Sequence, residues 1–131
     1  MELIGFVGVG TIGGVIARNL LRAGYAVMVH DIRTEAVEAL VEAGAQSAGS
    51  PAEVGRGCDV TFTSLPGPPE VEEVALGSAG LVRGVRKSSL YVDLSSSSPQ
   101  LIRRIAAEFH LRGARFMEYF GYEAGVMLAR A

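Results

Sequence analysis

Residues 4–31 read IGFVGVGTIGGVIARNLLRAGYAVMVHD and contain the clearest structural signal of the chain. The apolar run at residues 3–7 is too short for a core helix and is followed by a glycine, so it predicts a strand buried on both faces, as in a parallel sheet. From Thr11 the apolar period becomes helical, and Gly24 stands where a C-terminal cap is expected. A second apolar run occupies residues 26–30. The stretch therefore predicts a strand, a helix and a second strand, with the inward stripe of the helix at Ile12, Val15, Ile16 and Leu20.

The alternation of strands and helices continues along the chain. Thr34 is placed to cap a second helix, and Ser50 and Ser98 each precede a proline, a pair that is typical of helix N-termini. The helix after Thr34 is expected to bury Val37, Leu40 and Val41. Further strands are expected at residues 45–48, 59–65, 90–94 and 114–117, and further helices from residue 51, over 70–76 and from 99 to Gly113. Strands joined by crossover helices predict an open, doubly wound parallel α/β sheet of the Rossmann type, with strand order 3-2-1-4-5-6.

Composition limits the classes of function that fit. A chain of 131 residues, 49% of them hydrophobic and 20% charged, suits one globular domain. The net charge of −2 comes without a basic cluster, so neither a nucleic acid nor a membrane surface is an expected partner. The single cysteine, Cys58, excludes an internal disulfide, and no apolar run approaches the roughly 20 residues of a membrane span. We expect a cytoplasmic protein that handles a small molecule.

The glycines Gly8, Gly10 and Gly13 follow the first strand and open the first helix. In this context the first glycine allows a tight turn, the second lets the backbone approach a pyrophosphate, and the third lets the helix pack closely on the strand. The helix N-terminus adds unpaired amide groups and the positive end of a dipole, so an anion is expected there. The predicted dinucleotide-binding turn consists of Gly8, Val9, Gly10, Thr11, Ile12 and Gly13.

An acidic residue follows the second strand. Asp31 lies about 20 residues beyond the glycines, where a carboxylate can accept hydrogen bonds from both hydroxyls of an adenosine ribose. This position favours NAD, because the same charge would repel the 2′-phosphate of NADP. Arg33 is near enough to reduce that repulsion, so NADP stays open. Together with Ile32, these residues form the second expected part of a cofactor site.

Two later strand ends reach the same edge of the predicted sheet. Leu65 and Pro66 follow the fourth strand, and residues 93–99 (DLSSSSP) follow the fifth. The serines fit two interpretations. They are either a polar linker that ends in a helix cap, or they place the hydroxyl groups of Ser95 and Ser96 beside a nicotinamide. Spacing alone favours neither.

The segments IGFVGVGTIGGVIARNLLRAGY, HDIR, SLP, VDLSSSSP and GARFME occur in the order and spacing of one known family. On these motifs, the chain from Ile4 to Met117 resembles the N-terminal domain of the β-hydroxyacid dehydrogenases, which include 3-hydroxyisobutyrate dehydrogenase, tartronate semialdehyde reductase and 6-phosphogluconate dehydrogenase. The resemblance implies an NAD(P)-binding domain at residues 1–117 of an oxidoreductase that moves a hydride between nicotinamide and a small 3-hydroxy acid or its semialdehyde. It also implies that Leu65, Pro66 and Glu70 border the cofactor and that Ser96 touches its nicotinamide side.

The sequence departs from that family after its sixth strand. The family reads D-A-P-V-S-G-G there and holds the substrate carboxylate with Ser-Gly-Gly, whereas residues 118–122 read EYFGY. We therefore interpret residues 118–131 as a diverged C-terminal tail, whose aromatic surface suits self-association or a partner. The family's acid–base lysine belongs to a second, helical domain that is expected to be absent here, and the only lysine, Lys87, precedes the fifth strand at the opposite edge. We assign no catalytic and no metal-binding residue, and His30, His110 and Cys58 are expected to be structural or exposed.

Three functions stay open on the sequence. The first is the cofactor domain of a dehydrogenase, inactive alone because hydride transfer at a carbinol carbon also needs a proton donor or acceptor. The second is a non-catalytic module that senses or carries NAD(H) and acts through a partner. The third is a methyltransferase-like sheet, which also has a glycine-rich first turn and an acid after the second strand. The G-x-G-x-x-G spacing and the serine-rich fifth loop favour a dinucleotide over the third.

Overall fold

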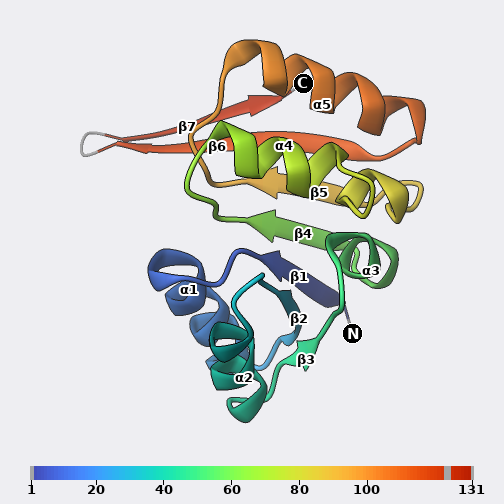
Figure 1. The fold of residues 1–131 in the computed structure, drawn as a ribbon. Helices are drawn as coiled ribbons and strands as arrows, with labels where there is room; N and C mark the ends of the chain where they lie inside the picture. The colour runs from blue at the N-terminus through green and yellow to red at the C-terminus, as the bar shows by residue number, and fades with distance from the viewer. Residues whose placement is uncertain (1, 123–124, 131) are drawn as a thin grey trace.

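The computed structural model describes residues 2–122 and 125–130, with side chains up to Tyr119. Strands and helices alternate from the N-terminus to the last strands (Figure 1). The strands are β1 (Leu3–Val7), β2 (Ala26–His30), β3 (Gln46–Ser47), β4 (Val60–Thr63), β5 (Leu90–Asp93), β6 (Arg115–Tyr122) and β7 (Gly125–Arg130). The helices are α1 (Thr11–Arg22), α2 (Thr34–Glu42), α3 (Pro51–Gly57), α4 (Pro68–Leu76) and α5 (Pro99–Leu111), and a short 3₁₀ turn, η1, spans Leu81–Arg83.

The strands form one sheet in the order β3-β2-β1-β4-β5-β6-β7. The strands β1 to β6 pair in parallel, which confirms the predicted doubly wound sheet and its order. The direction of winding reverses between β1 and β4. The loops that follow these two strands therefore lead to opposite faces and leave a crevice between them, which is where ligands bind in sheets of this class.

The C-terminal segment differs from the prediction. The sixth strand was expected to end at Met117, but β6 continues to Tyr122 and pairs antiparallel with β7. Much of the expected tail at residues 118–131 is therefore strand. Most of its side chains lie outside the described residues, so self-association through this tail stays a prediction.

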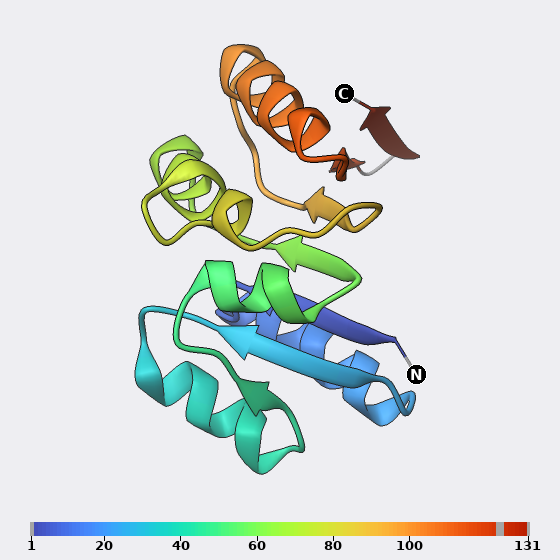
Figure 2. The ribbon, with the colours of Figure 1, turned by 90° about the vertical axis from the view of Figure 1, so that its right-hand side faces the viewer.

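Helices cover both faces of the sheet (Figures 1 and 2). On one face, α1 and α2 pack around an apolar cluster that includes Phe6 and Leu40. On the other face, α3, α4 and α5 pack around a larger cluster that includes Val54 and Ile105. β1 contributes Phe6 to the first cluster and Val7 to the second, because successive side chains of a strand point to opposite faces. A strand buried in this way reads as a continuous apolar run, as the sequence predicted.

The predicted helix caps are confirmed at several ends. Ser50 and Ser98 each accept a hydrogen bond, of 3.2 Å, from the backbone amide three residues later, at the starts of α3 and α5. Gly24 and Gly113 follow α1 and α5 with φ angles of +94° and +74°. This left-handed conformation ends a helix at little cost only when the residue is glycine.

The inward face of α1 was predicted wrongly in part. Ile12 and Val15 are 68% and 56% exposed. The buried residues of the helix are instead Gly13, which has no side chain, and Ala17, which has only a methyl group. They let α1 approach the sheet closely. The contact face is thus rotated from the most apolar stripe toward the smallest residues, and Ile16 and Leu20 pack at its border.

The predictions for α2 also need correction. Thr34 is the first helical residue and not the cap, because Arg33 occupies the N-cap position in an extended conformation, without a side-chain cap. Leu40 is buried, but Val41 is 43% exposed. The helix covers β2 and the two-residue β3 at the edge of the sheet, so it has little surface against which to bury a second row of side chains.

Candidate functional site

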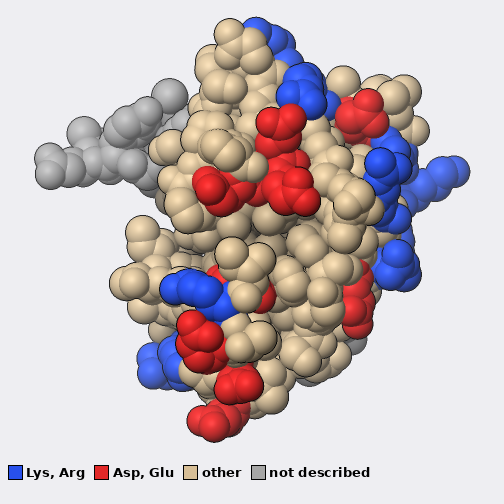
Figure 3. All heavy atoms as spheres, in the orientation of Figure 1, with Lys and Arg blue, Asp and Glu red and all other residues tan. Residues whose placement is uncertain are grey.

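A cavity of about 890 Å³ lies at the carboxyl edge of the sheet, next to the reversal between β1 and β4. Its walls come from the turns that follow β1, β2 and β4 and from the start of α4. On the face seen in Figure 3, acidic side chains gather over α4. The predicted cofactor residues that line the cavity are Gly8, Gly10, Thr11, Ile12, Gly13, Asp31, Ile32, Arg33, Leu65, Pro66 and Glu70. Three predicted residues do not line it: Val9, Ser95 and Ser96.

The glycines of the first turn meet three different surroundings. Gly8 has a φ of +90°, and a β-carbon there would overlap the carbonyl oxygen of Ser64. A β-carbon on Gly13 would overlap the carbonyl oxygen of Gly8. At Gly10 the nearest atom is Nη2 of Arg33, 2.8 Å from the ideal β-carbon position. At Gly8 and Gly13, neighbouring backbone atoms therefore exclude any side chain. At Gly10, the absence of a side chain keeps a space open that only the flexible tip of Arg33 enters.

The N-terminus of α1 borders this space. Gly10 is its N-cap, and no side chain caps the helix there. The first hydrogen bond of the helix runs from the amide of Gly14 to the carbonyl of the N-cap residue Gly10, at 2.7 Å. The backbone amides that precede Gly14 in the helix therefore lack a helical partner. Unsatisfied amides and the positive end of the helix dipole form an anion site. The arrangement fits the pyrophosphate of a dinucleotide.

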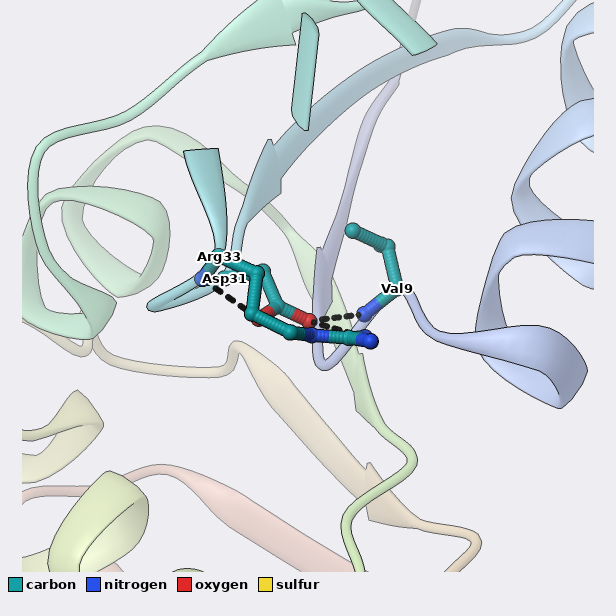
Figure 4. A network of polar contacts seen from close by, with 3 residues as sticks. All are labelled: Val9, Asp31 and Arg33. Carbon is teal, nitrogen blue, oxygen red and sulfur yellow. Dashed lines mark hydrogen bonds and ion pairs between the residues drawn. The ribbon is translucent and has the colours of Figure 1, made fainter. Parts of the chain in front are cut away.

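Asp31 is held in place by two backbone amides (Figure 4). Its Oδ2 accepts from the amide of Val9 and its Oδ1 accepts from the amide of Arg33, each at 2.9 Å. Burial acts to raise the pKa of Asp31, but these hydrogen bonds, with the neighbouring guanidinium, outweigh it, so the pKa is lowered from its ordinary value. Asp31 is thus an ionised acceptor beside the glycine turn. Val9 is buried and contributes its amide to this arrangement and no side chain to the cavity.

The loops after β4 and β5 are joined by a chain of hydrogen bonds. The hydroxyl of Ser95 accepts from the amide of Leu65 at 2.7 Å, and the amide of Ser95 donates to Oδ1 of Asp93 at 3.0 Å. Thr63 donates to the same Asp93 oxygen at 2.7 Å. Ser95 is buried, so its hydroxyl positions the Leu65 turn from behind, while Ser96 is exposed. The contact of Ser96 with a nicotinamide stays a prediction.

Several lining residues were not predicted. Ser64, Pro69, Glu73 and Val74 come from the turn after β4 and from α4, and Pro51 begins α3. Their position depends on how α3 and α4 pack against the sheet, which no local motif reports. His30 also lines the cavity, but its Nδ1 lies 2.9 Å from the carbonyl oxygen of Ala48, in agreement with the structural role expected for it.

A second unpredicted feature is a pair of buried carboxylates on neighbouring strands, at the end of β5 and within β6. Asp93 and Glu118 are fully buried and occupy paired positions on the two strands. Within the described part of the chain, Oδ2 of Asp93 and both oxygens of Glu118 have no hydrogen-bond partner. Burial, with the charge of Asp93, raises the pKa of Glu118 to about 7. Burial alternates along β6, so Glu118 lies on the same face of the sheet as Phe116. The period-two pattern of the sequence could have indicated this position, but it does not show which residue lies opposite Glu118.

The other candidate residues are where the sequence predicted them. Cys58 is buried, and burial raises its pKa to about 12, so it is not a reactive thiolate. Lys87 is exposed and packs near Gly113, ahead of β5 and β6 and away from the cavity. Over the described residues, no group of three or more metal-ligating side chains is present, and none of the helices has the length and apolar character needed to cross a membrane.

The chain is similar in sequence and in fold to several known proteins. 3-Hydroxyisobutyrate dehydrogenase, mitochondrial, of Mus musculus is 36% identical over 115 residues, which cover 88% of this chain and 34% of that protein. Cytokine-like nuclear factor N-PAC of Xenopus tropicalis is also 36% identical over 115 residues, 88% of this chain and 22% of that protein. The solved structure of Psf3 in complex with NADP+ and 2-OPP has a TM-score of 0.85 at 25% identity, covering 98% of this chain and 49% of that one. The chain therefore spans half the length of these proteins or less.

The family itself is shown by a match over nearly the whole chain. Residues 3–121 match the sequence model of the NAD binding domain of 6-phosphogluconate dehydrogenase. The match includes the glycine turn, Asp31 and the strand ends that surround the cavity. This chain belongs to the family of NAD-binding domains found in 6-phosphogluconate dehydrogenase.

Proposed function

We propose that this chain is the cofactor-binding part of a dehydrogenase that transfers a hydride between NAD(H) and a small 3-hydroxy acid or its semialdehyde. The observation that carries the proposal is the space at Gly10, bordered by the uncapped start of α1 and by the ionised Asp31. A pyrophosphate fits the space between Gly10 and the start of α1, and the diol of a ribose fits the carboxylate of Asp31. In this proposal Gly8 to Gly13 bind the pyrophosphate, Asp31 binds the adenosine ribose, and Leu65 and Pro66 border the nicotinamide half.

The proposed cofactor is NAD(H) before NADP(H). The carboxylate of Asp31 is ionised at neutral pH, since its pKa is lowered, and it would face the 2′-phosphate of NADP. Arg33 offers a compensating cation, and the similar Psf3 structure contains NADP+. We therefore expect tighter binding of NADH, with measurable binding of NADPH.

Proton transfer is assigned to another part of the proposed enzyme. Moving a hydride to a carbonyl carbon leaves an oxyanion that must receive a proton. Among the described residues that line the cavity there is no lysine, and His30 is bonded to the backbone of Ala48. This chain thus holds and orients the hydride carrier. The same proposal includes a small 3-hydroxy acid as the substrate of the whole enzyme. It also includes self-association through residues 118–131 and a cytoplasmic location.

The test is calorimetric titration of the 131-residue chain with NADH and NADPH. We expect NADH to bind more tightly, and Gly10→Ala and Asp31→Asn each to weaken NADH binding about tenfold or more, because a methyl group fills the space and a neutral amide loses charge-assisted bonds. Asp59→Asn is the matched control, since Asp59 is an exposed acid paired with Arg86 ahead of β4. A chain that circular dichroism shows to be folded, yet binds neither nucleotide, would overturn the proposal.

A further inference from the structure

The acceptor capacity of Asp31 is already fully used within the protein. Two carboxylate oxygens offer about four acceptor positions. The backbone amides of Val9 and Arg33 take one on each oxygen, at 2.9 Å. The other two are taken by the side chain of Arg33, with Nε 3.4 Å from Oδ1 and Nη2 3.5 Å from Oδ2.

The two pairs of bonds differ in strength and in permanence. The amide bonds are short and belong to the backbone, so they persist whenever the turns are folded. The guanidinium bonds are long, and the Arg33 side chain is 54% exposed against 8% for Asp31. An ion pair with such long distances and an exposed guanidinium contributes little to stability and breaks easily. The carboxylate is therefore fixed, and the guanidinium is the partner that can leave.

The position of the guanidinium coincides with the space expected for the ligand. Its Nε and Nη2 present two parallel N–H donors, one to each carboxylate oxygen, much as the 2′- and 3′-hydroxyls of a ribose present two donors to one carboxylate. Its Nη2 also lies against Gly10, 2.8 Å from where a β-carbon would be (Figure 4 shows the pairing with Asp31). One flexible side chain thus covers both the diol acceptor and the glycine that opens the pyrophosphate site.

We propose that Arg33 is an internal competitor that occupies the ribose-diol acceptors of Asp31 and must be displaced when a dinucleotide binds, an inference that rests on the proposed binding of NAD(H). Displacement has different consequences for the two cofactors. With NADH, the guanidinium loses its partner, and the ligand carries no phosphate on the ribose to replace it; the pyrophosphate is common to both cofactors. With NADPH, the released guanidinium lies next to a 2′-phosphate and forms a new charge-assisted pair. Arg33 therefore weakens NADH binding and strengthens NADPH binding. It reduces the preference for NADH over NADPH that Asp31 produces.

The experiment compares wild type, Arg33→Ala and Arg33→Lys in calorimetric titrations with NADH and NADPH. Arg33→Ala should bind NADH about two- to fivefold more tightly, the range of an exposed ion pair, and NADPH roughly tenfold more weakly. Arg33→Lys retains the charge without the two-donor fork, so it should also tighten NADH while it keeps most of the NADPH affinity. Arg86→Ala removes an arginine from an exposed pair with Asp59 and controls for the change in net charge.

The outcomes separate this inference from the proposed function. Unchanged or weaker NADH binding by Arg33→Ala, in a protein whose wild type binds NADH, overturns the competition and leaves the proposed function intact. If Arg33→Ala binds NADH and the wild type shows no detectable binding, the result supports competition by Arg33 strongly. Absence of binding by all three folded proteins overturns both proposals.

Discussion

The three glycines of the first turn show how one motif combines backbone and ligand requirements. A methyl group at Gly13 would meet the carbonyl oxygen of Gly8, which is backbone and cannot move aside, whereas a methyl group at Gly10 meets only the tip of Arg33. We expect Gly13→Ala to destabilise the fold by roughly 1–3 kcal/mol or more, as overpacking does. Gly10→Ala should change stability by less than about 1 kcal/mol, because it fills space reserved for a ligand. Urea denaturation measures both, and similar losses of stability in the two variants would contradict this division.

We expect Glu118 to make the stability of the domain depend on pH. Burial and the charge of Asp93 raise its pKa to about 7, from 4.5 in the unfolded chain. A carboxyl whose folded pKa is raised stabilises the fold fully below pH 4.5 and loses this contribution as the pH rises through 7. One pKa unit corresponds to about 1.4 kcal/mol, so the loss is on the order of 1–3 kcal/mol.

The corresponding test is urea denaturation between pH 4 and pH 8. Glu118→Gln should reduce the decline in the free energy of unfolding and be the more stable protein above pH 7, because a neutral amide replaces a buried charge. The part of the decline that comes from Asp93, whose pKa burial also raises, should remain. Glu72→Gln, which changes an exposed acid paired with Arg104, should preserve the wild-type pH dependence. An unchanged pH profile in Glu118→Gln would show that this carboxyl is not the responsible group.

At the scale of elements, Ser95 connects the loops that follow β4 and β5. Removal of its hydroxyl leaves the amide of Leu65 without its acceptor, at a cost of about 1–3 kcal/mol for a buried donor. We expect Ser95→Ala to lower the midpoint of thermal unfolding and to weaken NADH binding modestly, because the Leu65 turn borders the cavity. Ser96→Ala, at an exposed neighbour, should leave stability unchanged. If Ser96 contacts nicotinamide, Ser96→Ala weakens NADH binding without destabilisation, which titration and a melting curve together would detect.

The elements that sequence predicts well are those with local causes. The caps at Ser50 and Ser98 and the left-handed Gly24 and Gly113 depend on a few adjacent residues, so their positions can be read directly. The exposure of Val15 could not be inferred, because the contact face of α1 depends on how closely small residues let it approach the sheet. The β6–β7 pairing likewise joins segments whose register no local motif reports.

The same distinction holds for the candidate site. The glycine turn and Asp31 were predictable because a strand, a turn and a helix fix their spacing. Glu73 and Pro51 were missed, since they reach the cavity only through the packing of α3 and α4. The guanidinium of Arg33 was placed correctly near Asp31, but its occupation of the diol acceptors required side-chain coordinates.

At the scale of the whole molecule, the cavity joins two separately packed halves. The cluster with Phe6 and Leu40 lies under α1 and α2, and the cluster with Val54, Tyr91 and Ile105 lies under α3, α4 and α5. The cavity has walls from both sides, because the turns after β1 and β2 belong to the first and the turn after β4 with α4 to the second. A dinucleotide bound there would contact both halves at once and stabilise them together.

We therefore expect NADH to raise the stability of the chain as a single unit. At a concentration 100 times the dissociation constant, binding to the folded state alone adds about 2.7 kcal/mol, which corresponds to an increase in Tm of roughly 5–15 °C. Hydrogen exchange distinguishes the possible patterns. Core amides that exchange only through global opening are all slowed by the same factor when a ligand stabilises the folded state. Amides of β2, in the first half, and of β5, in the second, should be protected equally when NADH is added. Protection confined to β1, α1 and β2 would show instead that the two halves unfold independently and that the cofactor stabilises only the half that holds its pyrophosphate.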